Sequence, residues 1–275
     1  MPVATVLIPT HNHVTPIRYA VESVRAQTFG DFELFIVADG VGDEMRRTIG
    51  EFAAADSRIR VFDFPKGERK GERHRHAALA EASGDFVAYL GDDDVWAPNH
   101  LATMALLLNG ADFANTNHIG VNAERRLFWI PSDLSDQTMR ARMLVDPPFN
   151  LFDMTSAGHT LAAYRRLNIG WAPPVNCPWA DLYLWRQFLA EPWCRARSAP
   201  FATAVCTHTH IGPNLSDAER GRESKALLAL VSDAAAWGEA WRRLSGSASP
   251  IIVPPTPRPG RFQRMFARGS GPTRL

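Results

Sequence analysis

The stretch Asp85-Phe86-Val87-Ala88-Tyr89-Leu90-Gly91-Asp92-Asp93-Asp94-Val95-Trp96 joins a short apolar run to three consecutive carboxylates. The apolar part predicts a buried strand that ends at a glycine. Three adjacent carboxylates repel one another, and each is costly to desolvate unless a positive charge lies among them. Adjacent Asp residues at a strand end suit a hard cation, because Mg²⁺ is commonly held by one or two carboxylates plus substrate phosphates. Taken alone, the triplet fits a cation site and a solvated acidic turn equally well.

Upstream of this stretch, apolar runs alternate with helix-forming segments. Strands are predicted over residues 4–8, 32–38 and 58–62, and helices over residues 16–24, 43–54 and 75–82, with a further helix from Pro98. Such alternation indicates βαβ units and a mostly parallel sheet, in which ligands bind beyond the carboxyl ends of the strands. Asn12, Asp39 and the Asp triplet all follow strand ends. We therefore expect them at one sheet edge, which favours the cation site over the solvated turn.

Composition limits the class of protein. The 275 residues are 45% hydrophobic and 21% charged, with a net charge of +1, an ordinary globular mixture whose charge argues against general nucleic-acid binding. The three cysteines show no CxxC spacing, so neither a disulfide framework nor a zinc knuckle is indicated, and a reducing cytosol fits best. The first residues lack the basic region of a secretory signal, and no apolar run approaches a membrane span.

The second half of the chain is less regular. It predicts strands over residues 113–116, 160–164 and 201–206, a hairpin over 121–130, and helices over 179–190 and 216–244. Residues 245–259 are rich in Ser and Pro and indicate a linker, and residues 260–275 are basic. The expected division is a regular first half (1–115), a less regular second half of the same domain (116–245), and a Pro-rich linker with a basic tail (246–275).

Four segments in order resemble family-2 glycosyltransferases with the GT-A fold: residues 6–12 (VLIPTHN), 36–40 (IVADG), 75–85 (RHAALAEASGD) and 90–98 (LGDDDVWAP). Each segment alone is weakly specific, but the ordered set is strong. The chain departs from the family pattern at Ala38, where an Asp is usual, at His76, where Asn is usual, and at Gly91, where the first Asp of the acidic motif is usual. The resemblance implies a GT-A-type α/β fold, with a mostly parallel central sheet flanked by helices and a less regular acceptor-binding C-terminal half. It also implies that residues 1–115 are the nucleotide-sugar-binding half and that residues 116–245 are the acceptor-binding and catalytic half of the same domain.

The resemblance also implies an activity, namely metal-dependent transfer of a sugar from a nucleotide-diphosphate donor to an acceptor hydroxyl. Inversion at the anomeric carbon and a role in polysaccharide or glycoconjugate synthesis are implied in the same way. A divalent cation, Mn²⁺ or Mg²⁺, would neutralise the charge that develops on the leaving diphosphate. By position in the motifs, the metal ligands are expected to be Asp93 and His210, and the residues expected to bind the donor nucleotide are Pro9, Thr10, Asn12, Asp39, Arg75 and Asp92.

Each assignment has a structural alternative. Asp39 precedes Gly40 and fits a turn, Thr10 and Asn12 fit turn formation, and Arg75, like Arg73, fits a solvated helix face. Asp94 fits a helix cap. His208 follows the same strand as His210 and is the other candidate for the metal or the diphosphate.

The general base of the family lies near the start of a later helix, and Asp181 occupies that place in the chain. Its alternative is a first-turn Asp that the helix dipole favours. Trp171, Trp179 and Trp185 fit a sugar platform, although core packing suits most of them better, and for His159 a structural role is preferred to one on the acceptor side.

Two other functions compete with the transferase. A sugar-phosphate nucleotidyltransferase also places carboxylates at a sheet edge, but its glycine-rich loop is missing from Pro9-Thr10-His11-Asn12-His13. A non-catalytic nucleotide-sugar-binding module would keep binding without turnover. The expected partners are a nucleotide-sugar donor, with UDP favoured, and a carbohydrate or lipid-linked acceptor. The expected location is the cytoplasm. The basic tail fits peripheral contact with the inner face of the membrane and fits a disordered segment at least as well.

Overall fold

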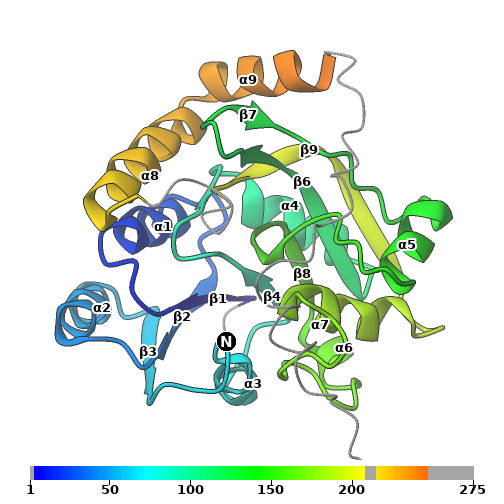
Figure 1. The fold of residues 1–275 in the computed structure, drawn as a ribbon, viewed down its shortest axis with the longest axis horizontal. Helices are drawn as coiled ribbons and strands as arrows, with labels where there is room; N and C mark the ends of the chain where they lie inside the picture. The colour runs from blue at the N-terminus through cyan, green and yellow to red at the C-terminus, as the bar shows by residue number, and fades with distance from the viewer. Residues whose placement is uncertain (1–2, 208–214, 247–275) are drawn as a thin grey trace, which may run out of the picture.

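The computed structural model describes residues 3–207 and 215–246, and its strands form one curved sheet between helices (Figure 1). The strands are β1 (Ala4–Thr10), β2 (Phe32–Asp39), β3 (Ile59–Phe64), β4 (Phe86–Tyr89), β5 (Val95–Trp96), β6 (Phe113–Val121), β7 (Leu127–Phe128), β8 (Ala157–Thr160) and β9 (Ala196–Cys206). Their order across the sheet is β3-β2-β1-β4-β8-β6-β9-β5, and β7 pairs with β6.

The first four strands are parallel, as the alternation in the sequence predicts. β1 lies between β2 and β4, and β3 pairs with β2. Beyond β4 the sheet is mixed, because β8 runs antiparallel to both β4 and β6, and β5 runs antiparallel to β9. The mostly parallel α/β fold expected from the sequence is therefore confirmed. Strands from both halves of the chain share this sheet.

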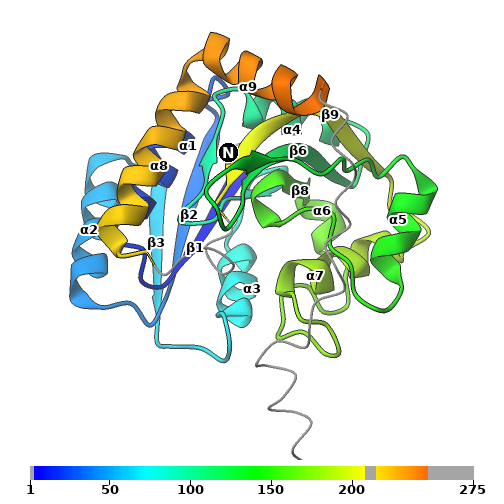
Figure 2. The same cartoon turned by 45° about the horizontal axis from the view of Figure 1, so that its top comes forward.

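Helices cover both faces of the sheet (Figures 1 and 2). They are α1 (Pro16–Arg25), α2 (Asp43–Ala55), α3 (Glu72–Ala80), α4 (His100–Leu108), α5 (Gln137–Leu144), α6 (Leu161–Tyr164), α7 (Ala180–Leu189), α8 (Asp217–Ser232) and α9 (Ala234–Gly246), with a 3₁₀ turn, η1, at Met154–Ser156. One core joins the sheet to α1, α2 and α4, a second joins it to α3, α6 and α7, and a third lies under α8 and α9.

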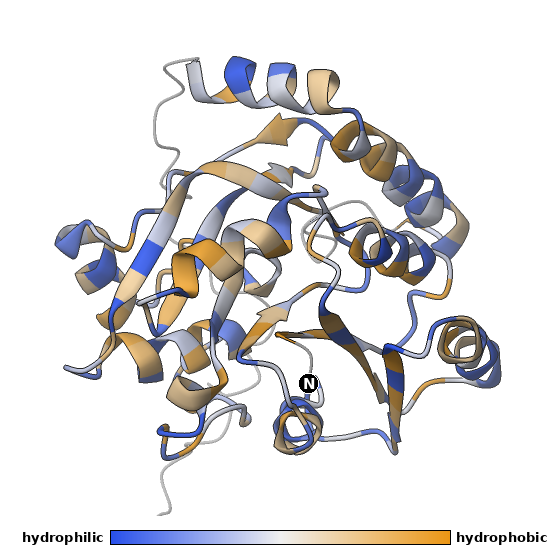
Figure 3. Ribbon diagram, turned by 180° about the vertical axis from the view of Figure 1, so that it is seen from behind, coloured by the Kyte–Doolittle hydropathy of each residue, from blue (hydrophilic) through white to orange (hydrophobic). Residues whose placement is uncertain are grey.

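The continuous apolar runs of the parallel strands follow from this two-sided cover. Val6 and Ile8 belong to the core under α1, whereas Leu7 between them belongs to the core under α3 and α7. A strand alternates its side chains between two faces, so a strand that is buried on both needs apolar residues throughout. The surrounding helices carry both hydrophilic and hydrophobic residues around their circumference (Figure 3).

Several expected elements differ from those observed. Residues 160–164 are not a strand, because β8 ends at Thr160, whose side chain accepts a hydrogen bond from Ala163 N at 3.1 Å and starts α6. The long helix expected over 216–244 breaks at Asp233 into α8 and α9. The strand expected over 113–116 extends to Val121, and α5 was not anticipated. Within the described residues, no helix has the length and apolar character needed to cross a bilayer.

Candidate active site

The acidic triplet lies in a tight turn directly after β4. Leu90 N still donates to Leu7 O at 3.1 Å, which continues the pairing with β1 by one residue, and Asp94 N then donates to Gly91 O at 3.2 Å. Gly91 N donates to the Thr155 hydroxyl at 3.0 Å. The turn is thus fixed from β1 on one side and from η1 on the other.

Asp94 is the buried member of the triplet, and it anchors the turn. Its carboxyl pairs with the Thr155 hydroxyl and accepts from Thr207 N at 2.8 Å. Burial, together with the charges of Asp93 and Asp153, raises the pKa of Asp94 well above its usual range. The helix-cap interpretation of Asp94 is therefore wrong, because its partners are Thr155 and Thr207.

The same packing explains Gly91, which stands where the family usually has a carboxylate. A Cβ atom at this position would lie 2.6 Å from Asp94 Oδ2 and 3.3 Å from the Thr155 hydroxyl. The first distance is too short for any Cβ atom, and the second is tight, so a side chain here would displace the Asp94 carboxyl. In this chain the position is filled by the buried Asp94 carboxyl, which leaves Asp92 and Asp93 as the carboxylates of the turn that lie near His13.

Asp92 and Asp93 lie beside His13, which the sequence did not single out. Asp92 accepts from the Thr10 hydroxyl at 2.6 Å and pairs with His13 Nδ1 at 2.8 Å, and an Asp93 oxygen lies 3.9 Å from the same nitrogen. Burial alone would lower the pKa of His13, but the hydrogen bond to Asp92 and the charges of both carboxylates raise it to about 9. One ligand atom from each of the three residues lies within 4.8 Å of the others.

Asp39, at the end of β2, accepts from two donors and lies beside a histidine. Its carboxylate pairs with Lys66 Nζ, accepts from Gly67 N at 2.6 Å, and lies 3.5 Å from His74 Nε2. Burial alone would raise the pKa of Asp39, but these hydrogen bonds and the charges of Lys66 and His74 lower it below its usual range. Asp39 is thus an ionised acceptor at the same sheet edge as the acidic turn.

Arg75, in α3, is buried rather than part of a solvated helix face. Its guanidinium carbon lies 4.8 Å from the centre of a Trp171 ring, and Nη2 donates to Lys70 O at 2.9 Å. Nε finds no hydrogen-bond partner among the described residues. Burial lowers the pKa of Arg75, while the charges of Glu72, Asp181 and Asp39 act in the opposite direction. Arg75 is therefore close enough to interact electrostatically with Asp39, a candidate for binding the donor nucleotide, and with Asp181, the candidate general base.

Asp181 lies in the first turn of α7, as the sequence predicts. Its Oδ2 accepts from Asn150 Nδ2 at 3.0 Å and its Oδ1 from Leu182 N at 2.9 Å. Burial raises the pKa of Asp181 to about 6, and the charge of Asp153 adds to this effect against the two hydrogen bonds. A carboxylate with a pKa near the working pH is suited to accept a proton from a hydroxyl group.

The other predicted residues are spread more widely. Pro9 pairs with Val37 in the sheet, and Asn12 is exposed. His208 and His210 lie outside the described residues. The tryptophans lie in or against the core under α3 and α7: Trp171 and Trp185 are fully buried, and Trp179 packs beside them.

His159 is also structural, as the sequence interpretation preferred. Burial lowers the pKa of this histidine to about 4, so its ring is neutral at physiological pH. Its Nε2 pairs with the Tyr89 hydroxyl at 2.6 Å, and Trp171 Nε1 donates to the same hydroxyl at 3.0 Å.

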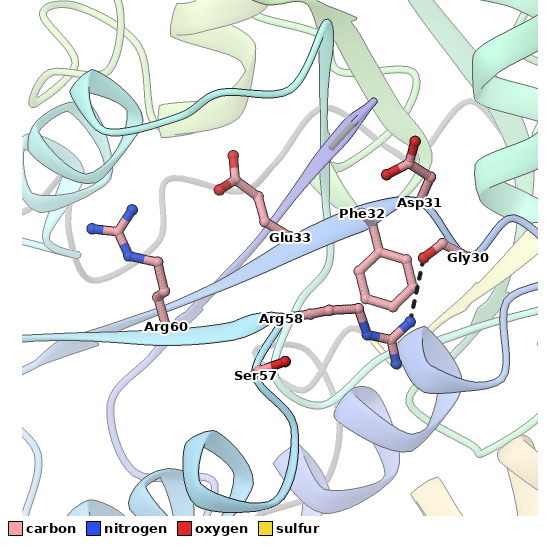
Figure 4. A pocket seen from close by; sticks show the side chains of 7 residues that line it. All are labelled: Gly30, Asp31, Phe32, Glu33, Ser57, Arg58 and Arg60. Carbon is pink, nitrogen blue, oxygen red and sulfur yellow. Dashed lines mark hydrogen bonds between the residues drawn. The ribbon is translucent and has the colours of Figure 1, made fainter. Parts of the chain in front are cut away.

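A cavity of about 440 Å³ lies at the opposite, amino edge of the sheet, where β2 and β3 begin (Figure 4). It is lined by residues that include Glu33, Arg58 and Arg60, and the Arg58 guanidinium lies 4.2 Å from the centre of the Phe32 ring. None of the candidate site residues borders this cavity. The candidate active site at the carboxyl edge of the sheet therefore does not coincide with this cavity.

Solved structures establish the class of fold. S. aureus TarS in complex with UDP-GlcNAc aligns with a TM-score of 0.58 at 19% identity, covering 83% of this chain and 66% of that one. The mannosyltransferase PcManGT from Pyrobaculum calidifontis in complex with GDP-Man and Mn²⁺ aligns with a TM-score of 0.55 at 18% identity, covering 87% and 64%. The chain has the GT-A fold.

The family follows from the sequence match. The model of glycosyl transferase family 2 matches residues 5–166, more than half of the chain, so the chain belongs to that family. The Escherichia coli UDP-Glc:alpha-D-GlcNAc-diphosphoundecaprenol beta-1,3-glucosyltransferase WfgD is 32% identical over 122 residues, which cover 43% of this chain and 46% of that protein. The Campylobacter jejuni GalNAc(5)-diNAcBac-PP-undecaprenol beta-1,3-glucosyltransferase is 29% identical over 104 residues, covering 38% and 34%. The matches to these two relatives span less than half of their length.

Proposed function

We propose that this protein is a divalent-cation-dependent, inverting glycosyltransferase that moves a sugar from a nucleoside-diphosphate donor to an acceptor hydroxyl. The observation that carries the proposal is the carboxylate pair Asp92 and Asp93, which Thr10 and His13 contact at the carboxyl edge of the sheet, inside the region that matches the family. In open α/β sheets this edge is where ligands bind.

The residues of the edge fit a metal and a nucleotide. Asp92 and Asp93 offer the hard oxygen ligands that Mn²⁺ and Mg²⁺ prefer, and the raised pKa of His13 beside them supports a place for a positive charge there. A bound cation would stabilise the negative charge of the leaving diphosphate. We assign Asp93 to the metal and Asp92 to the ribose or a metal-bound water. His210, proposed as a further ligand, lies outside the described residues.

The remaining roles follow the contacts. Asp39 is an ionised hydrogen-bond acceptor suited to an N–H group of the nucleobase, such as that of uracil. Thr10, Pro9 and Asn12 border the same edge of the sheet. Arg75 keeps a buried Nε without a partner among the described residues, a donor suited to a phosphate oxygen. Asp181, with its pKa of about 6, takes the proton from the acceptor hydroxyl as that oxygen attacks the anomeric carbon on the face opposite the leaving group.

The acceptor is proposed to be a lipid-linked saccharide, because the two curated relatives carry diphosphoundecaprenol or PP-undecaprenol in their names. This acceptor class fits a protein that works at the inner face of the cytoplasmic membrane, with the basic tail as its contact. Sedimentation with anionic vesicles tests the contact. Full-length protein is expected to sediment with them, and a variant ending at residue 245 is expected not to; equal sedimentation of both would refute the role of the tail.

A thermal-shift panel tests the central proposal. UDP-, GDP- and dTDP-sugars are added with and without Mn²⁺, and a UDP-sugar is expected to raise the Tm in a Mn²⁺-dependent way. Asp93→Ala should lose the Mn²⁺-dependent part of the rise. Asp31→Ala, which changes an exposed carboxylate at the opposite sheet edge, is the matched control and should keep it. If no nucleotide stabilises the protein in a Mn²⁺-dependent way, the proposal fails.

A turnover assay distinguishes a transferase from a module that only binds the nucleotide sugar. A non-catalytic module would bind metal and nucleotide equally well with Asp181→Asn and would show no turnover in either form. For the transferase, the variant keeps the thermal shift and loses sugar transfer. The anomeric configuration of the product, read by NMR, tests inversion directly.

A further inference from the structure

A second group of metal-ligating side chains lies next to the segments that hold the acidic turn, and the proposed mechanism does not use it. His118 is on β6, Cys206 is the last residue of β9, and Asp153 directly precedes η1. One ligand atom from each lies within 4.8 Å of the others. His118 and Cys206 are nearly inaccessible to solvent, at 4% and 1% exposed.

The sheet register brings these three residues together. β6 and β9 pair in parallel, with His118 opposite Ala204 and Gly120 opposite Cys206. Because residues two apart on a strand share a face, His118 and Cys206 project from the same face of the sheet. Asp153 approaches that face as the N-cap of η1, and the Cys206 thiol donates to Asp153 Oδ1 at 3.2 Å.

The ligand chemistry differs from that of Asp92 and Asp93. An imidazole, a thiolate and a carboxylate form a borderline-soft set, which suits Zn²⁺ and its neighbours in the first transition row. Mg²⁺ prefers oxygen ligands alone. Three protein ligands with room for a fourth group are typical of zinc sites that keep one position open to water or another ligand.

We propose that His118, Asp153 and Cys206 bind one divalent transition-metal ion of the zinc class, in addition to the cation at Asp92 and Asp93. On binding, the Cys206 S–H bond breaks, its proton passes to solvent, and a sulfur–metal bond forms in place of the hydrogen bond to Asp153. The oxidation states of the sulfur and the metal do not change.

The position of this metal site gives it a structural consequence. Thr155, two residues after Asp153, contacts both Asp94 and Gly91 N, and Thr207, next to Cys206, donates its N–H to Asp94. A metal that joins Asp153 to Cys206 therefore ties together the two segments that hold the acidic turn. Binding should raise the Tm, because the folded protein presents the three ligands together and the unfolded chain does not.

Cobalt provides a spectroscopic test on the full-length protein. The protein is stripped with a chelator and titrated with Co²⁺ in excess Mg²⁺, which occupies oxygen-only sites. A thiolate-to-cobalt charge-transfer band is expected to saturate at one equivalent and to disappear when Zn²⁺ is added. Cys206→Ser should abolish the band. Cys194→Ser, which changes another buried cysteine, is the matched control and should keep it.

Two further variants keep the test decisive. Asp153→Asn retains the thiol, so the band should persist while the Kd for Co²⁺ rises by roughly tenfold or more. Asp93→Ala should leave the band and its stoichiometry unchanged, because Asp93 belongs to the other cluster. The proposal is overturned by absence of the band, by a band that survives Cys206→Ser, by an unchanged Kd in Asp153→Asn, or by loss of the band in Asp93→Ala. Circular dichroism checks that each variant folds.

Discussion

Replacing Asp181 by Asn should stabilise the fold at pH 8 and strongly reduce sugar transfer in the same protein. The side chain keeps its size and its helix position, and only the ability to ionise is removed. Asp136→Asn is the matched control, because Asp136 is an Asp at the start of another helix, α5, and lies outside the site. Asn is as good a helix cap as Asp, so this control should change neither stability nor turnover.

The magnitude follows from the pKa of Asp181, which burial raises from 3.8 to about 6. Between these two pH values the unfolded chain has lost the proton while the folded chain retains it, so stability falls as the pH rises. Above pH 6 the folded protein carries the full penalty, roughly 3 kcal/mol at about 1.4 kcal/mol per pH unit. Asn avoids this penalty but gives up one of the two acceptor oxygens, at a cost of about 1 kcal/mol.

The variant is therefore expected to be about 1–2 kcal/mol more stable than the parent at pH 8 and about 1 kcal/mol less stable at about pH 3, where the Asp is largely protonated in both states. Urea unfolding at the two pH values measures this change of sign. For activity, kcat/KM of the parent should fall tenfold per pH unit below about 6, and Asp181→Asn should lose about 10²–10⁴-fold at pH 8.

The two readouts refute different parts of the reasoning. A variant that is less stable than the parent at pH 8 would show that burial does not penalise the carboxylate. A variant that transfers sugar at the rate of the parent would show that Asp181 is not the base, whatever its pKa. Gain of stability together with loss of turnover is the pattern that a buried catalytic base produces and a helix-capping Asp does not.

Three further predictions concern the surroundings of the site. Gly91→Ala places a Cβ atom 2.6 Å from Asp94 Oδ2, so urea unfolding should show a loss of about 1–3 kcal/mol, whereas equal stability would show that the turn can relax. Tyr89→Phe leaves the ring nitrogens of His159 and Trp171 without their hydroxyl partner and should lower the free energy of unfolding by about 1–3 kcal/mol. The Mn²⁺ dependence of nucleotide binding should stay unchanged, and a change in it would place Tyr89 in the site. Asp39→Asn removes the charge paired with Lys66 and should weaken uridine binding by roughly 10–100-fold, as measured by calorimetry. An unaltered affinity would show that Asp39 does not bind the nucleobase.

The sequence is most informative where the chemistry is local. The alternation of strands and helices gives the four parallel strands, and the common carboxyl edge then brings Thr10, Asp39 and the acidic triplet to one side of the sheet. The position of Asp181 in the first turn of a helix also follows from its neighbours in sequence. In each case the signal lies within one strand–helix unit, where periodicity and end residues are sufficient.

Contacts between distant segments give no such signal. Asp94 is anchored by Thr155 and Thr207, which are 61 and 113 residues away, and nothing beside them in the sequence marks them as partners. The mixed part of the sheet was partly misjudged for the same reason, because a short run such as residues 160–164 fits a strand and a helix alike until its packing is known. His13 was within reach, since it lies three residues after Thr10 at the end of β1, and a histidine at a strand end is a reasonable partner for adjacent carboxylates.

The triplet shows why identical residues in a row need not share a role. Three ionised carboxylates at one turn would repel strongly, yet the turn is stable because its members differ in surroundings. Burial and its carboxylate neighbours raise the pKa of Asp94, which favours its neutral form, and the hydrogen bond and charge of Asp92 help to raise the pKa of His13 to about 9. Both effects reduce the repulsion within the turn. Asp94 can serve as an anchor because its contacts with the Thr155 hydroxyl and Thr207 N do not require a charge. Asp92 and Asp93 are then the two carboxylates beside which a divalent cation would be held.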